Sequence, residues 1–200
     1  MKRMGSFLVL GLCAAVLCSG ASCSSNASGD TNSEDATYAE QHAYHVCEGV
    51  FAYSTPVAVG SDQFANNQSL ILGDAVMESS NGSTWQATSV HFISAVEPGT
   101  SHEMIYLTYT KAGGQPEEMI VAPNTCFLLT DGSLKYASHL TIADQIRMAN
   151  GGAASVGAIS AKLCSDGVVA IRVTPSFDTA SDKYLNYNGL VSTEYFFDQW

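Results

Sequence analysis

Basic side chains are scarce in this sequence. Of its 200 residues only 8 are Lys or Arg, against 19 Asp or Glu, so the formal net charge is −11. Because phosphate contacts require Lys and Arg, this balance argues against a nucleic-acid-binding protein. The few basic residues beyond the N-terminal segment are scattered, so no polybasic patch for an anionic membrane surface is present. We therefore expect neither nucleic acid nor a charged lipid surface as a partner.

Charged residues of both signs make up only 14% of the chain. So low a fraction excludes a disordered chain, a coiled coil and a helical array. Hydrophobic residues reach 46% and aromatic residues 10%, which suits one globular domain with a sizeable core at this length.

The apolar run near the N-terminus, Phe7 to Leu17, is too short to cross a bilayer, which needs about 20 residues. Lys2-Arg3 precedes it and the small residues Ser19-Gly20-Ala21 follow it, as in a secretory signal peptide. We expect residues 1–21 to be removed after Ala21 and the mature chain to be secreted, with no transmembrane span. The alternative is a lipoprotein, anchored through a lipid on Cys23.

The cysteines include no Cys-x-x-Cys pair, so neither a zinc ribbon nor a thioredoxin-like redox site is expected. Two of the six cysteines, Cys13 and Cys18, lie in the leader, and Cys23 lies just beyond it. The other three, Cys47, Cys126 and Cys164, remain in the domain. Three domain cysteines allow one internal bridge and leave one thiol.

The composition and residue pattern of the chain change at Val50. Residues 22–49 are predicted to form a polar tether and a short helix, the helix spanning Ser33 to Cys47 with Thr31 and Glu34 as its capping box. Residues 50–200 show no sustained helical periodicity. We expect them to form an all-β domain.

Short β-branched and aromatic runs between Gly, Asn, Asp and Pro residues carry this prediction. The strands expected are Val57–Val59, Ser89–Ser94, Met104–Thr110, Glu118–Val121, Cys126–Leu129 and Val168–Thr174. Hairpin turns are expected at Thr130–Ser133 and Asn150–Gly152.

An internal repeat divides the β domain. A shift of 70 residues places Asp74 and the residues around it on Asp144. After a four-residue deletion, residues 89–95 match residues 155–161 at five of seven positions, and the same shift of 66 pairs Ile105 with Ile171. Two tandem β-units of about 60 residues are the simplest interpretation.

Four blocks in this region resemble the Hint domains of hedgehog proteins and inteins, and the hedgehog type most closely. Residues 50–57 are similar to the family opening Cys-Phe-x-x-x-Thr-x-Val, and residues 70–76 to Leu-x-x-Gly-Asp-x-Val. Residues 120–128 resemble the strand with Thr-x-x-His, and residues 187–195 the closing Val-Asn-Gly-Val-Val-Ala-Ser-x-Tyr. The resemblance implies two duplicated β-units with pseudo-two-fold symmetry and a self-cleaving activity through a Cys thioester.

The family's chemical positions are replaced here. The nucleophilic Cys is replaced by Val50, the Thr by Ala122 and the His by Thr125. An intein's closing His-Asn would fall near Ser192 and Thr193, and the five residues after Tyr195 leave no room for a sterol-recognition extension. Because nucleophile and proton carriers act as a unit, we expect a catalytically degenerate module used for binding or as a structural element, with no cofactor.

Cys47 leaves one alternative open. As a displaced nucleophile it would release residues 22–46 from an active autoprocessing domain. The opposing interpretation is a disulfide with Cys126, which adjoins the degenerate Thr-x-x-His block in a fold that brings this block to the first strand. An exported chain favours the disulfide.

Other reactive residues receive structural interpretations. His42, His45 and Cys47 lack a fourth ligand, so no metal site is expected. Ser138, His139 and Asp144 are the residue types of a hydrolytic triad, but triads are recognised by geometry. We expect His139 on the surface, and Asp74 and Asp144 to cap turns.

Overall fold

The computed structural model describes residues 45–176, 182–195 and 197–199, which contain seventeen β-strands and two short 3₁₀ segments. The expected leader, the tether and most of the expected helix lie outside these residues. The helix prediction is wrong for its last three residues, because His45–Cys47 form strand β1. They are extended because they pair antiparallel with β17 (Phe197–Gln199) at the other end of the chain.

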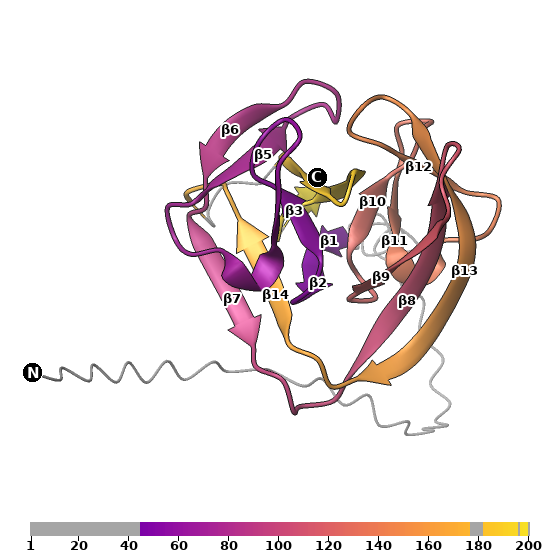
Figure 1. Cartoon of the computed structure of the whole chain (residues 1–200), viewed down its shortest axis with the longest axis horizontal. Helices are drawn as coiled ribbons and strands as arrows, with labels where there is room; N and C mark the ends of the chain where they lie inside the picture. The colour runs from indigo at the N-terminus through magenta and orange to yellow at the C-terminus, as the bar shows by residue number, and fades with distance from the viewer. Residues whose placement is uncertain (1–44, 177–181, 196, 200) are drawn as a thin grey trace, which may run out of the picture. The chain divides into compact units, whose positions relative to one another are not determined.

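Seven strands form one antiparallel sheet, in which the long β8 and β13 run side by side (Figure 1). Its order is β12 (Gln145–Arg147), β13 (Ala153–Cys164), β8 (His102–Lys111), β9 (Pro116–Val121), β2 (Val50–Ala52), β14 (Val168–Arg172) and β7 (Phe92–Val96).

The eight-stranded sheet is built around a hairpin near the C-terminus, β15 (Tyr184–Tyr187) and β16 (Leu190–Thr193). Strands of the first unit join β15 and those of the second unit join β16. On the β15 side are β3 (Pro56–Ala58) with β4 (Phe64–Asn66), and β5 (Ala75–Ser79) with β6 (Gln86–Ser89). On the β16 side are β10 (Cys126–Leu128) and β11 (Leu134–Tyr136).

The expected strands and turns are present, with one correction. The single strand expected over Ser89–Ser94 is two strands, since β6 ends at Ser89 and β7 begins at Phe92. Between them the backbone N–H of Val90 donates to the Asp74 carbonyl and that of His91 donates to the Arg172 carbonyl, so the chain passes from one sheet to the other. Gly132 and Gly151 have φ of +90° and +83° in the two expected hairpin turns, a conformation that glycine adopts without strain.

The predicted duplication is confirmed by the hydrogen bonds. Phe51 in β2 and Val121 in β9 are 70 residues apart and pair directly with each other, so the pseudo-two-fold axis passes between them. The 3₁₀ segments Asn67–Ser69 and Ala137–His139 occupy equivalent places. The backbone N–H of Asp74 donates to Ile71 and that of Asp144 to Thr141, at 3.1 and 3.0 Å.

One part of the predicted alignment is wrong. Ile93 pairs with Ile171, and its equivalent Ile159 pairs with Leu107. Ile171 therefore corresponds to Leu107 and not to Ile105. The connection between β13 and β14 (residues 165–167) is two residues shorter than that between β7 and β8 (residues 97–101), which changes the shift from 66 to 64.

The core lies where both units meet the central hairpin. Phe51 is fully buried, stacked on Tyr187 with ring centroids 3.7 Å apart and edge-on to Phe127 at 6.4 Å. Each aromatic side chain buried in this way removes about 150–250 Å² from water. The start of β2 is thereby fixed against both halves of the domain.

Candidate functional site

The peptide group at the start of β2 is the centre of the candidate site. The Val50 N–H in this group is shared between the Glu48 carbonyl at 2.9 Å and the Thr125 hydroxyl at 3.2 Å. The Val50 carbonyl, in the next peptide group, accepts from the Ala122 N–H at 3.0 Å. The Thr125 hydroxyl lies 2.8 Å from the Glu48 carbonyl oxygen and 3.1 Å from the Val50 carbonyl oxygen, so it donates its proton to the backbone. The three family positions predicted from the resemblance, Val50, Ala122 and Thr125, thus meet at the two peptide groups of Val50.

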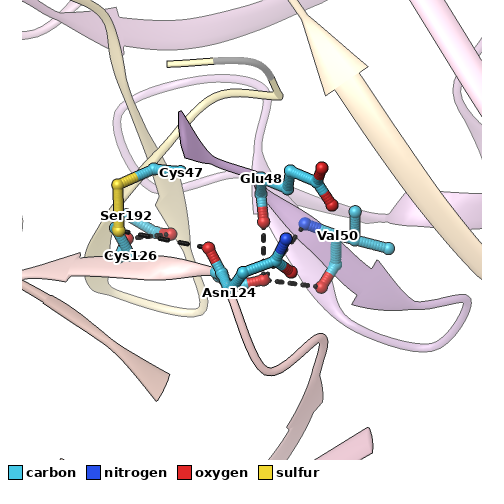
Figure 2. The surroundings of a disulfide bond; sticks show 7 residues. Cys47, Glu48, Val50, Asn124, Cys126 and Ser192 are labelled. Atoms are coloured by element: carbon cyan, nitrogen blue, oxygen red, sulfur yellow. Dashed lines mark hydrogen bonds between the residues drawn. A yellow bond between two sulfur atoms is a disulfide. The ribbon is translucent and has the colours of Figure 1, made fainter. Parts of the chain in front are cut away.

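A tight turn after β9 places the Thr125 side chain. The Thr125 N–H donates to the Ala122 carbonyl at 3.1 Å, and the Asn124 carbonyl accepts from the Glu48 N–H at 3.0 Å. Figure 2 shows Glu48 and Val50 alongside Asn124, with dashed hydrogen bonds between the two segments. Thr125 is completely buried, so its hydroxyl is committed to these backbone groups.

The expected disulfide between Cys47 and Cys126 is present beside this peptide group (Figure 2). Both residues are buried and their Cα atoms are 5.4 Å apart. Cys164 is the unpaired thiol of the domain and is also buried. In the disulfide form the Cys47 sulfur is not a thiolate and cannot attack a carbonyl.

Gly49 lets the end of β16 approach the site, and sequence reasoning missed this residue. A Cβ atom built on Gly49 would lie 2.3 Å from the Thr193 carbonyl oxygen and 2.9 Å from the Glu194 carbonyl carbon. Only glycine fits such an approach. Ser192 on the same strand donates its hydroxyl to the Cys126 carbonyl at 2.8 Å. The signal available in the sequence was a glycine directly before the opening block.

Two buried charged side chains support the end of β16. Glu194 is completely buried and accepts hydrogen bonds from the Thr174 hydroxyl and from the backbone N–H groups of Val173 and Thr174. Arg172 is also buried and donates to the carbonyl of Tyr195 at 3.1 Å. Burial lowers the pKa of Arg172, against the opposing effect of the Glu194 charge. These groups position the backbone around Gly49.

The remaining predicted residues do not join this site. His139 is exposed and its ring lies edge-on to Tyr136 at 5.5 Å. The Asp144 carboxylate accepts from Thr141 and Lys135, as expected of a turn cap. Asp74 caps the equivalent turn by accepting from the Ile71 N–H at 3.0 Å. The hydrogen bonds of Asp144 thus connect it to its own turn and to Lys135 rather than to a Ser–His pair.

Within the part of the chain that the structure describes, no group of three His, Cys, Asp or Glu side chains is placed to hold a metal ion. His42 lies outside this part. Nor does this part include a helix with the length and apolar character needed to cross a membrane.

Comparison with known proteins gives a match in structure and none in sequence. No family model and no curated protein sequence matches this chain. A DnaB intein from Synechocystis sp. PCC 6803 superposes with a TM-score of 0.56 at 12% identity, over 73% of this chain and 98% of the intein. The bacterial intein-like domain of Clostridium thermocellum gives a TM-score of 0.55 at 16% identity, over 72% and 97%.

A gp41-1 intein carrying three substitutions gives 0.53 at 14% identity, over 73% of this chain and 99% of the intein. Nearly the whole of each of these three domains is therefore matched by the described β domain. At such low identity the match establishes the fold and not the chemistry. The chain has the Hint fold.

Proposed function

We propose that this protein is an exported Hint domain that no longer cleaves itself and acts as a binding or structural module. The observation that carries the proposal is the hydrogen bond from the Val50 N–H to the Thr125 hydroxyl. It places position 125, where the resemblance expects the catalytic His, against the amide that the family would break. Position 50, where the nucleophile is expected, has an aliphatic side chain.

The residues at the Gly49–Val50 bond lack the groups that each step of the family's self-cleavage requires. Conversion of the Gly49–Val50 amide to a thioester needs a thiolate on residue 50 and a proton donor for the departing nitrogen. The Val50 side chain has no heteroatom, Ala122 has no hydroxyl, and the Thr125 hydroxyl donates its own proton to the backbone carbonyls of Glu48 and Val50. Losing groups that act as a unit removes several orders of magnitude of rate.

The hedgehog type remains the proposed subtype on the strength of the closing block. Tyr187-Asn188-Gly189-Leu190 forms the turn of the central hairpin, with φ of 51° at Asn188 and 88° at Gly189. An Asn-Gly pair with two positive φ values is the favoured two-residue hairpin connection. The Asn-Gly pair that resembles the hedgehog-type closing block therefore has a conformational role in this chain.

Export is proposed from the leader and is supported by the disulfide, because such bonds persist in oxidising compartments. We propose a secreted chain cut after Ala21, with lipid attachment at Cys23 as the alternative. Edman sequencing of the mature protein from its natural host distinguishes the two. Ser22 at the N-terminus supports secretion, and a blocked, diacylated Cys23 supports the anchor.

The second candidate function is active autoprocessing by Cys47, with release of residues 22–46. Its single favourable observation is the position of Cys47, three residues before Val50 and beside the same peptide groups. The bond to Cys126 opposes it, since a sulfur in a disulfide is not nucleophilic.

Intact mass separates the two functions. The purified mature chain is incubated with dithiothreitol or hydroxylamine, and the variant Cys126→Ser, which frees the Cys47 thiol without a reductant, is incubated alongside. We expect every sample to remain uncleaved. Scission just before Cys47 that is abolished by Cys47→Ala would establish the second function instead.

Restoring the family residues is the complementary test. Val50→Cys alone is expected to remain intact, because no proton carrier accompanies the thiol. The triple variant Val50→Cys, Ala122→Thr and Thr125→His is expected to show thiol-dependent scission at the Gly49–Val50 bond. Scission by Val50→Cys alone would show that the site had lost its nucleophile only.

A further inference from the structure

A second cluster of reactive side chains lies at the tip of the central hairpin, and the proposed function does not use it. Lys111 on β8 and Glu117 on β9 form an ion pair, with the Lys111 Nζ 2.9 Å from the Glu117 Oε2. The Asn188 carboxamide donates from Nδ2 to the same Oε2 at 2.7 Å. The Lys111 Nζ is 3.5 Å from the Asn188 Oδ1. One carboxylate oxygen therefore contacts both an amine and a carboxamide that face each other.

The surrounding residues hold these groups in place. The Tyr109 hydroxyl accepts from the Asn188 Nδ2 at 2.7 Å and donates to Glu117 at 3.1 Å, and Tyr109 itself is fully buried. The Asn188 backbone N–H donates to the Pro56 carbonyl at 2.8 Å. The Lys111 Nζ lies 3.8 Å from the point where a Cβ on Gly189 would be, so the lysine extends along the hairpin turn.

We propose that Lys111 and Asn188 form an intramolecular isopeptide bond, with Glu117 carrying the proton between them. Glu117 first takes a proton from the Lys111 ammonium, and the neutral Nζ then attacks the Asn188 Cγ to form a new Nζ–Cγ bond. Glu117 delivers this proton and then a second proton from Nζ to Nδ2, the Cγ–Nδ2 bond breaks, and the nitrogen leaves as ammonium. No oxidant, reductant or cofactor is required, because the reaction exchanges one amide for another.

The charge states of the cluster suit this sequence. Burial raises the pKa of Glu117, but the Lys111 ammonium and the hydrogen bonds from Asn188 and Tyr109 outweigh it and leave the pKa below its usual value. Glu117 is therefore a carboxylate at neutral pH and can act as the base. Burial, followed by the Glu117 charge, raises the pKa of Tyr109, so its hydroxyl stays protonated and keeps orienting the carboxamide.

Proximity supplies the rate that an unactivated carboxamide lacks. Well-oriented intramolecular reactions reach effective molarities on the order of 10⁵–10⁸ M. The reacting groups belong to strands of a packed sheet and to a two-residue turn, which restricts their movement. The link would close a loop between residues 77 positions apart and join the first long strand of the domain to its central hairpin.

Asn188 precedes a glycine, so deamidation through a succinimide is the competing reaction. That route needs the Gly189 backbone nitrogen to attack Cγ, but its N–H is donated to the Asn186 Oδ1 at 2.8 Å. These hydrogen bonds thus favour attack by Lys111. The two reactions change the mass in opposite directions, since deamidation replaces NH₂ by OH and the isopeptide loses ammonia.

High-resolution intact mass of the purified mature chain, with and without dithiothreitol, tests the proposal. The expected result is a mass lower than that of the sequence by one ammonia after the disulfide is accounted for. Tandem mass spectrometry of a tryptic digest should then find one branched peptide that contains both Lys111 and Asn188. Chains left at the full sequence mass after prolonged incubation, or raised by deamidation, would overturn it.

Variants assign the roles. Lys111→Arg keeps the positive charge but has no acylable amine, so the ammonia should be retained while the circular dichroism spectrum is unchanged. Glu117→Gln should slow the loss at least about 100-fold, the lower range for a positioned proton carrier. The matched control is Lys135→Arg, since Lys135 also contacts a carboxylate, Asp144, but faces no carboxamide in its hydrogen bonds. Loss of ammonia in Lys111→Arg would overturn the assignment.

Discussion

The turn at Asp74 in the first unit and the turn at Asp144 in the second have the same backbone hydrogen bonds and different side-chain support. Asp74 accepts from one backbone N–H, that of Ile71. Asp144 accepts from the Thr141 N–H, the Thr141 hydroxyl and both contacts of Lys135. The positions equivalent to Thr141 and Lys135 in the first unit are Ile71 and Ala65, which offer neither a hydroxyl nor a charge.

Equivalent turns also differ in their side-chain bonds at the candidate site. Thr55 and Thr125 close equivalent turns, but Thr125 is the one whose hydroxyl bonds to the Val50 peptide group. Cys126 carries the disulfide, and its equivalent in the first unit is Pro56. The duplicated backbone pattern is thus sufficient for the fold, while the side-chain bonds at these two pairs of equivalent turns are found in the second unit.

Removing the disulfide should have the largest effect on stability among the changes that make the two units more alike. The double variant Cys47→Ser, Cys126→Ser opens a loop between residues 79 positions apart and should lower the free energy of unfolding by about 4 kcal/mol. Urea unfolding without reductant measures it. Cys164→Ala is the control for loss of a buried thiol and should cost about 1 kcal/mol. Equal losses in the two proteins would show that the bridge does not stabilise the second unit.

The pair at the pseudo-two-fold axis tests whether equivalent core positions contribute equally. Phe51→Ala removes a ring that is stacked on Tyr187 and edge-on to Phe127, and should cost about 3–4 kcal/mol. Val121→Ala removes two methyl groups at the equivalent position and should cost about 2 kcal/mol. Chemical denaturation of both variants gives the comparison. A larger loss at Val121 would contradict the dominance of the aromatic contacts.

The two aspartates give a smaller difference. Asp144→Ala should cost about 2 kcal/mol, because it removes a cap and leaves Lys135 without its partner. Asp74→Ala should cost about 1 kcal/mol, the usual value for one side-chain cap. Thermal unfolding of both variants at one pH measures the gap. If the two losses are the same, the contacts of Lys135 contribute nothing to stability.

The smallest predicted effect is on the pH dependence of stability. Burial raises the pKa of Asp144, but the hydrogen bonds from Lys135 and Thr141 and the Lys135 charge leave it below its usual value of 3.8. Its contribution is therefore complete above the unfolded pKa and is lost as pH falls through the lower folded pKa. The stability difference between the natural protein and Asp144→Asn should shrink between about pH 5 and pH 2. A difference that is constant across this range would contradict the prediction.

Local pattern and the internal repeat predicted most of the fold. Each expected strand has a counterpart, and the turns at Asp74 and Asp144 superpose in their hydrogen bonds because tight turns are specified by nearby residues. The helix expected up to Cys47 is wrong at its end, because pairing of β1 with distant β17 overrides local preference. The alignment of Ile105 with Ile171 is wrong because hydrophobic alternation is unchanged by a two-residue slip.

The candidate site was predictable where the resemblance covered it and not elsewhere. Val50, Ala122 and Thr125 were identified and meet at the two peptide groups of Val50. Gly49 was not identified, because the residues that contact it lie more than 100 positions away in the sequence. The buried pair Arg172 and Glu194 was not identified either, because these side chains bond to segments more than 20 positions away. No periodicity or spacing reports such long-range packing.

The direct pairing of Phe51 with Val121 has a consequence for how such a chain arose. In a closed homodimer the residue on the symmetry axis meets its own copy, and the interface is self-complementary. Here β2 meets β9, its own equivalent, in antiparallel register at that point. At this point the single chain has the symmetry of a contact between two identical half-length proteins, as expected if a gene for a symmetric dimer was duplicated and fused.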